Sequence, residues 1–85
     1  FTLRQNYPNP FNPSTTIRYG LPIRSHVSLT VYNTLGQGVA TLMNGEQDPG
    51  YHEVRFDGST LPSGVYFYRL QSRSYAETKK LLLIR

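Results

Sequence analysis

Few side chains in this sequence are of the types that carry out chemistry. The two histidines, His26 and His52, are the candidates for general acid–base catalysis, and His52 lies close in sequence to Glu53 and Asp57. Adjacent residues of a strand point to opposite faces, so His52 and Glu53 would not meet in an extended segment. We therefore expect His52 to be a solvent-facing strand residue, and we expect no enzyme activity.

The sequence also lacks the spacing of a metal or cofactor site. It contains no cysteine, which excludes a thiolate site and a disulfide. The segment Asp57-Gly58-Ser59 offers too few oxygens for calcium, which takes about six to eight ligands, and is typical of a turn. The sequence therefore predicts no catalytic residue, no metal ligand and no cofactor.

The basic residues are unevenly placed along the chain. Residues 1–63 hold four arginines and four carboxylates, whereas residues 64–85 hold five basic residues and one carboxylate, so the whole net charge of +4 belongs to the second segment. A basic cluster favours an anionic partner. It also suits the edge of a sheet, where lysine and arginine block unwanted pairing. The cluster is too small for a nucleic-acid surface, which needs basic and aromatic residues over a continuous face.

The seven tyrosines keep carbohydrate binding open as an alternative, because aromatic rings can stack on sugars. Tyr66 and Tyr68, however, recur with the period of buried strand residues. An accessory carbohydrate-binding or spacer module of a secreted enzyme is therefore the second hypothesis for function.

Apolar residues recur with a period of two along nearly the whole chain, which indicates strands rather than helices. The turn residues that separate them include Gly36, Asn44-Gly45, Asp48-Pro49-Gly50 and Pro62-Ser63-Gly64. The expected strands are residues 17–21, 27–32, 38–43, 51–56, 65–72 and 76–84. The side chains expected inside are Ile17, Tyr19, Leu21, Val27, Leu29, Val31, Val54, Phe56, Tyr66, Tyr68 and Leu70, with Leu61 as a buried plug in a loop. The pattern predicts an all-β fold, an antiparallel two-sheet, immunoglobulin-like β-sandwich of Greek-key type with about seven strands.

A run rich in proline and asparagine precedes the first expected strand. Its three prolines fix their own φ and lack a backbone donor, so the run cannot form a helix or a central strand. We expect a stiff lead-in, residues 1–14, that packs through the apolar anchors Tyr7 and Phe11 on a single sandwich domain, residues 15–85. The chain has no initiator methionine, and we expect it to be part of a longer protein. Its longest apolar run, residues 81–84, is too short to span a membrane, so we expect no membrane insertion.

Several segments together closely resemble the C-terminal sorting domains of the type IX secretion system. The resemblance covers nearly the whole chain, and the order and spacing of the segments agree with the family. The segments are Asn6-Tyr7-Pro8-Asn9-Pro10-Phe11-Asn12-Pro13, Val31-Tyr32-Asn33-x-Leu35-Gly36-Gln37, Gly50-x-His52-x-Val54-x-Phe56-Asp57-Gly58, Ser63-Gly64-Val65-Tyr66-Phe67-Tyr68-Arg69-Leu70 and Thr78-Lys79-Lys80-Leu81-Leu82-Leu83-Ile84-Arg85. Each segment alone is a weak motif, whereas the set is specific.

The resemblance implies a non-catalytic address that directs an attached cargo protein through the outer membrane of bacteria of the Bacteroidetes group. It implies transit through the periplasm and arrival at the cell surface or outside the cell. The implied partners are the outer-membrane translocon, a surface transpeptidase that removes the domain, and a cargo domain on the N-terminal side. The signal of the family lies towards the C-terminal strands, which gives nine expected recognition residues: Gly64, Tyr66, Lys79, Lys80, Leu81, Leu82, Leu83, Ile84 and Arg85.

Within this set, the charged residues are the better candidates for direct contact. Gly64 and Tyr66 have ordinary structural explanations, a turn for the glycine and the core for the tyrosine. Lys79 and Lys80 are adjacent in a strand and face opposite ways, which leaves at least one of them exposed. We expect a receptor to meet these lysines, Arg85, the terminal carboxylate or the open edge of the last strand.

Overall fold

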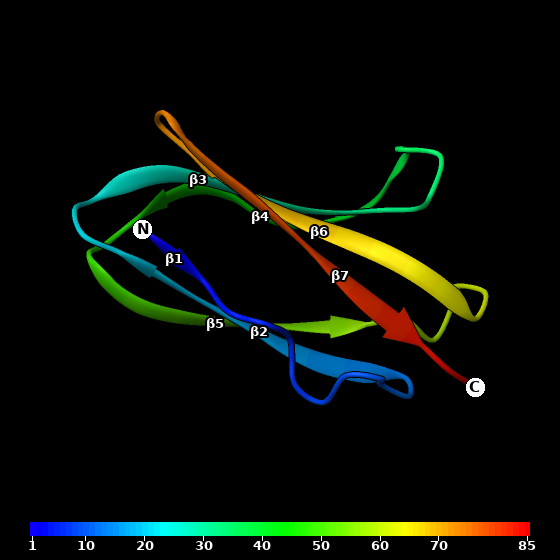
Figure 1. Ribbon diagram of the computed structural model, residues 1–85. Coiled ribbons are helices and arrows are strands. Elements are labelled where there is room, and N and C mark those ends of the chain that lie inside the picture. Colours follow the sequence, from blue (N-terminus) through cyan, green and yellow to red (C-terminus); the bar gives the residue numbers. More distant parts are fainter.

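The chain folds into two antiparallel β-sheets that face each other (Figure 1). The structure is a computed structural model that describes residues 1–85. A three-stranded sheet has the order β1-β2-β5, and a four-stranded sheet has the order β4-β3-β6-β7. The strands are β1 (Thr2–Leu3), β2 (Ser14–Leu21), β3 (Ser25–Tyr32), β4 (Gly38–Gln47), β5 (Gly50–Asp57), β6 (Gly64–Ser72) and β7 (Tyr75–Leu83). The predicted all-β sandwich of about seven strands is confirmed, and the structure has no helix that is long and apolar enough to cross a membrane.

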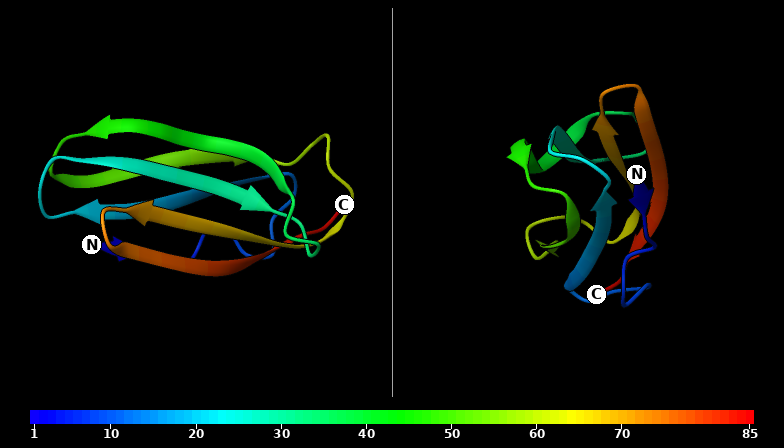
Figure 2. Two further views of the ribbon diagram at one scale, coloured as in Figure 1. Left: turned by 90° about the horizontal axis from the view of Figure 1, so that it is seen from above. Right: turned by 90° about the vertical axis from the view of Figure 1, so that its left-hand side faces the viewer.

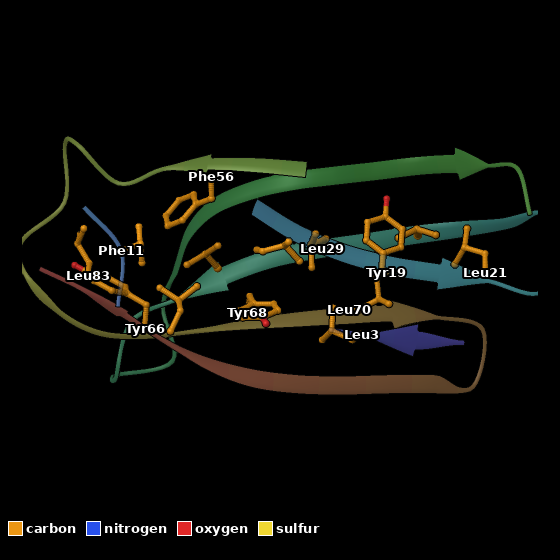
Figure 3. Packing of buried hydrophobic residues seen from close by; sticks show 14 residues of the cluster. Leu3, Phe11, Tyr19, Leu21, Leu29, Phe56, Tyr66, Tyr68, Leu70 and Leu83 are labelled. Carbon is orange, nitrogen blue, oxygen red and sulfur yellow. The ribbon is translucent and has the colours of Figure 1, made fainter. Parts of the chain in front are cut away.

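The core lies between the sheets and is built from alternate residues of the strands (Figure 3). In β6, Tyr66, Tyr68 and Leu70 are buried, while the side chains between them face outward. The core residues predicted in β2 and β3 are also buried, and those of β5 differ only in that Val54 is half-buried. Leu61, expected as a buried plug, packs against the core but stays partly exposed. Each large apolar side chain buried in this way contributes about 1.5–3 kcal/mol.

Strand β4 is longer than predicted. We expected it to end at Met43 and a surface loop to follow from Asn44, but it runs to Gln47 and pairs with β3 along its length. The long β3 supplies partners for this segment, and this pairing overrides the local turn signal. The extension from Asn44 to Gln47 pairs with β3 in continuous register, whereas two register shifts lie earlier in the strand, and only Asp48 and Pro49 then lead into β5.

The prediction for His52 was wrong. The residue is half-buried rather than solvent-facing, and its ring stacks on that of Tyr19, which lies opposite it in β2, with 5.4 Å between the ring centroids. Its Nε2 atom also forms a 2.8 Å hydrogen bond with the carbonyl oxygen of Asp48. The reason is strand parity, since His52 shares the inward face of β5 with Val54 and Phe56.

Residues 1–14, predicted as one lead-in, include β1 and the first residue of β2. The part between these two strands, residues 4–13, crosses from one sheet to the other, and from here on the name lead-in refers to this part alone. At its start it pairs with β2, because the N–H of Tyr7 donates to the carbonyl of Thr16 and the N–H of Thr16 donates to the carbonyl of Tyr7, both at 3.0 Å. Near its end it pairs with β7, because the N–H of Phe11 donates to the carbonyl of Leu82 at 3.0 Å. Bent segments that change sheets in this way close the corner of a sandwich.

Of the two expected anchors in the lead-in, one was correctly predicted. The ring of Phe11 is buried, with only 1% of its surface exposed, and lies 5.9 Å from that of Phe56. Tyr7 is 82% exposed, so its prediction as an anchor was wrong. The backbone bridge between Tyr7 and Thr16 turns the tyrosine ring outward and turns Asn6 inward, because neighbouring extended residues point opposite ways.

Asn6 instead anchors this part of the lead-in through polar contacts. Its amide Nδ2 donates to Thr15 Oγ1 at 3.0 Å and to the carbonyl of Pro8 at 3.1 Å. Its backbone N–H donates to the hydroxyl of Tyr68 at 2.8 Å, and that hydroxyl donates to the carbonyl of Arg4 at 2.7 Å. Burial raises the pKa of Tyr68 to about 12, so this hydroxyl remains a protonated donor to well above neutral pH. Tyr68 of β6 therefore fastens the lead-in to the four-stranded sheet.

The two ends of the chain lie at opposite ends of the sandwich (Figures 1 and 2). Phe1 stacks on Tyr75 beside the β6–β7 turn, with 5.1 Å between the ring centroids. Arg85 lies at the other end, against the loop between β5 and β6. A segment that preceded Phe1 would therefore leave from the end opposite to Arg85.

Candidate functional site

The expected recognition residues of β7 are divided between the core and the surface. Leu81 and Leu83 point between the sheets and have no exposed surface. Lys80 and Leu82 point to the outer face, where Lys80 is exposed and Leu82 is half-buried. Ile84, just after the strand, is 46% exposed. Three of these five side chains are therefore within reach of a partner.

Gly64 and Tyr66 have structural roles. Gly64 begins β6 with φ at 151°, a backbone conformation that residues with a Cβ rarely adopt. Tyr66 is buried, with 6% of its surface exposed, and its hydroxyl donates to the carbonyl of Pro62 at 2.7 Å. Both residues hold the turn into β6 and leave little for a partner to contact.

Arg85 is occupied by the loop between β5 and β6. Its Nε donates to the carbonyl of Leu61 at 3.0 Å, and its Nη2 donates to the same oxygen at 2.6 Å and to the carbonyl of Gly58 at 3.2 Å. A further bond goes to the carbonyl of Ser59. The guanidinium thus ties the end of the chain to this loop.

Lys79 lies on the inward side of β7 and is paired. Its ammonium is 3.3 Å from Glu77 Oε2, and 28% of its side chain is exposed. Glu77 also accepts a 2.5 Å hydrogen bond from the hydroxyl of Tyr75, and this bond, together with the contact to Lys79, lowers the pKa of Glu77. Lys79 therefore offers less free charge than Lys80.

Around Lys80, the outer face of the four-stranded sheet combines rings and cations. Tyr32, Phe67 and Lys80 lie in register across β3, β6 and β7, and Arg69 lies in the next row of β6 between Thr30 and Thr78. The rings are half-buried, and both cations are exposed and form no salt bridge. We call Tyr32, Phe67, Arg69, Lys80 and Leu82 the β3–β6–β7 surface.

A shallow depression of about 330 Å³ lies on this surface, and its lining includes Tyr32, Phe67, Arg69 and Thr78. The only carboxylate that β4 and β3 add to this outer face is Glu46, which is paired with Arg24 at 3.6 Å. The local charge is therefore positive, and the face suits a partner with anionic groups next to apolar ones.

The outer edge of β7, which we expected to be open, is occupied by the lead-in at its C-terminal end. Gln5 Nε2 donates to the carbonyl of Lys80 at 2.8 Å, and the N–H of Leu82 donates to Asn9 Oδ1 at 3.0 Å. The backbone of Phe11 exchanges hydrogen bonds with the carbonyl of Leu82 and the N–H of Ile84, both at 3.0 Å. A partner cannot add a strand here unless the lead-in moves away.

A comparison with known families matches nearly the whole chain. The family model described as a secretion system C-terminal sorting domain matches residues 5–84. This chain belongs to that family. Among curated proteins, none matches the chain. The sorting domain therefore serves type IX secretion, interacts with the secretion machinery, and marks a protein that is exported through the outer membrane to the cell surface or secreted.

Our sequence reasoning did not single out Tyr32, Phe67 and Arg69 of the sorting domain as site residues. The alternation of β6 did place Phe67 and Arg69 on the side away from the core. Their place beside Lys80 depends on the strand order β3-β6-β7, which joins segments far apart in sequence. The sequence feature that could have identified this surface is a tyrosine, a phenylalanine and two cations at outward positions of three expected strands.

Proposed function

We propose that the sorting domain is a non-catalytic address and that the secretion machinery recognises it through the β3–β6–β7 surface. The main support for this proposal is that most basic residues among residues 64–85 already have a partner within the domain. Lys79 pairs with Glu77, while Arg73 and Arg85 donate to backbone carbonyls. Of the five basic residues of residues 64–85, only Arg69 and Lys80 remain free for an external anion, and both lie beside the half-buried rings of Tyr32 and Phe67.

Within the nine residues expected from the sequence, we propose a division of roles. Lys80, Leu82 and Ile84 contact the machinery, since their side chains are at the surface. Lys79, which is paired with Glu77 and partly exposed, makes a smaller contribution at the edge of this contact. The remaining five residues act indirectly by holding β6, β7 and the adjoining loop in shape: Gly64, Tyr66, Leu81, Leu83 and Arg85.

The proposed partners follow from this role. The domain is read in the periplasm by the outer-membrane translocon, and a surface transpeptidase then separates it from a cargo on its N-terminal side. The positions of Phe1 and Arg85 support this arrangement, because a cargo joined before Phe1 would leave from the end of the sandwich that is remote from Ile84. The cargo would then leave the β3–β6–β7 surface uncovered during transit.

Export of a fusion protein tests the proposal. Residues 1–85 are fused behind a periplasmic reporter in a host with a type IX system, and the fraction of reporter at the surface or in the medium is measured. We expect export of the parent fusion and retention in the periplasm of the R69E/K80E variant. Retention of the parent fusion would exclude the address role.

The matched control is R4E. Arg4 is exposed, its side chain forms no salt bridge, and its backbone pairs with the three-stranded sheet, so the substitution makes the same charge change as R69E or K80E on the other side of the molecule. We expect R4E to be exported like the parent. R69E/K80E changes the net charge by −4 and R4E by −2, so each single variant, R69E or K80E, is compared with R4E. Export of both single variants at the level of R4E, with all three variants folded, would refute the proposed surface and leave the address role intact.

A further inference from the structure

Of the four edge strands of the sandwich, β5 presents the longest uninterrupted edge. Strand β1 has two residues, and β7 is covered by the lead-in at its C-terminal end. Strand β4 contains two register shifts, and bulges of this kind discourage pairing with another chain. Strand β5 pairs with β2 over all eight of its residues without a shift, and no other strand lies beyond it.

The backbone groups on the open side of β5 follow from the pairing of β2. Thr16 and Arg18 of β2 bond to the lead-in, so the odd-numbered residues of β2 bond to β5. The even-numbered residues of β5 lie in register with them and bond to β2. The backbone N–H and C=O groups of the odd-numbered residues of β5 therefore point to the open edge. No backbone bond outside the strand ladders satisfies the groups on this edge, which belong to Tyr51, Glu53, Arg55 and Asp57.

We propose that this edge pairs with the same edge of a second copy of the chain. In the proposed antiparallel pairing, Val54 lies on the two-fold axis and Glu53 faces Arg55 of the second copy. Both residues carry their backbone groups towards the edge, so the hydrogen-bond pattern of an antiparallel pair is fulfilled. The two copies then form one continuous six-stranded sheet from two three-stranded sheets through an isologous contact.

Charge selects this register over its neighbours. Within one copy, Arg18 Nε lies 2.5 Å from Glu53 Oε2 across β2 and β5, and Arg55 has no acidic side chain within salt-bridge distance. In the proposed pairing, Glu53 lies between Arg18 of its own copy and Arg55 of the other. A shift of the two-fold axis to residue 53 or 55 would place like charges opposite each other, which destabilises cross-strand pairs.

The contact is small and its association is weak. It consists of up to about eight backbone hydrogen bonds and two symmetric pairs of charges, without a large apolar area. We expect it to form at high concentration, as when many copies gather at one place. Analytical ultracentrifugation of residues 1–85, from about 10 µM to about 1 mM, should show the mean mass rise from the 9.7 kDa monomer towards twice that value. A monomer throughout this range would overturn the proposal.

Three variants test the register. R55E places a second carboxylate opposite Glu53 of the other copy and should weaken association by about tenfold or more. The R18E/E53R/R55E variant reverses all three charges of the row and should restore association. R69E makes the same charge change as R55E on the four-stranded sheet and should associate like the parent. Equal association of R55E and R69E would refute the β5 contact.

Amide exchange supplies a measurement that does not depend on how well the variants fold. On the parent chain, the N–H groups of Glu53 and Arg55 should exchange more slowly as concentration rises. The N–H of Val54 already bonds to β2 and should change little. Unchanged exchange at Glu53 and Arg55, in samples that do associate, would place the contact elsewhere and overturn the proposal.

Discussion

Replacement of the two aromatic residues of the lead-in by alanine should have very different effects on stability. Phe11 is 1% exposed, its ring packs against Phe56, and its backbone bridges to Leu83. Removal of a buried phenylalanine ring costs about 3–5 kcal/mol, which includes the cavity that it leaves. A domain of 85 residues has a free energy of unfolding of roughly 4–13 kcal/mol, so Phe11→Ala should remove a large part of it.

Tyr7→Ala should change the free energy of unfolding by no more than about 0.5 kcal/mol. The ring is 82% exposed, and alanine keeps both backbone bonds to Thr16. Urea unfolding followed by tyrosine fluorescence and circular dichroism measures both variants, and Phe11→Leu supplies a milder change of about 1–2 kcal/mol if Phe11→Ala does not fold. A loss below about 1 kcal/mol for Phe11→Ala, or an equal loss for Tyr7→Ala, would refute this account of how the lead-in is attached.

Two further predictions concern hydrogen bonds. Tyr68→Phe removes a buried hydroxyl with two backbone partners in the lead-in and should lower the free energy of unfolding in urea by about 1–3 kcal/mol. Tyr66→Phe removes a single hydrogen bond and should lower it by about 0.5–1.5 kcal/mol. A larger loss for Tyr66→Phe than for Tyr68→Phe would contradict the proposed attachment of the lead-in. Hydrogen bonds from the backbone N–H of Ser59, at 2.9 Å, and then from its side chain lower the pKa of Asp57. The stability that the ionised Asp57 contributes is therefore present above the unfolded-state pKa near 3.8 and is lost as the pH falls below this value. Asp57→Asn should therefore narrow the difference between the urea unfolding midpoints at about pH 6 and about pH 3. An unchanged difference would contradict this role of Asp57.

The fold was predictable because its signal is local and repeated. Residues such as Val27, Leu29 and Val31 alternate with polar neighbours, and this period survives in the structure unchanged. The end of β4 was not predictable in the same way, because Asn44 lies in a strand only through its pairing with Ser28. Local turn signals report what a segment prefers alone, and they fail where a long neighbouring strand supplies partners.

The lead-in shows a second limit of the sequence. Alternation can be followed along a strand, but three prolines within six residues bend the chain and interrupt the period. Nothing in the composition of the run indicates that Asn6 turns inward while Tyr7 turns outward. The polar network of Asn6 with Tyr68 joins segments that are 62 residues apart, and such contacts become visible only with the fold.

The proposed recognition surface, the β3–β6–β7 surface, was partly predictable for the same reason. The charge count directed attention to residues 64–85, and strand parity correctly required an exposed lysine there. Parity also assigns Leu81 and Leu83 to the core once β7 is known to be a strand of a sandwich. The sequence could not show which basic residues were already occupied, because the partners of Arg85 are backbone carbonyls of a loop that precedes β6.

The two ends of the sequence therefore form one structural unit. The lead-in places Phe11 against Leu83 and bonds along the edge of β7 from Lys80 to Ile84, so the last strand is held on one side by β6 and on the other by the first residues of the domain. This pairing on both sides holds the backbone of β7 at Lys80 and Leu82, whose side chains lie on the outer face. A proline-rich motif at the start and a basic strand at the end thus both support the proposed β3–β6–β7 surface, because the first covers the edge of the second.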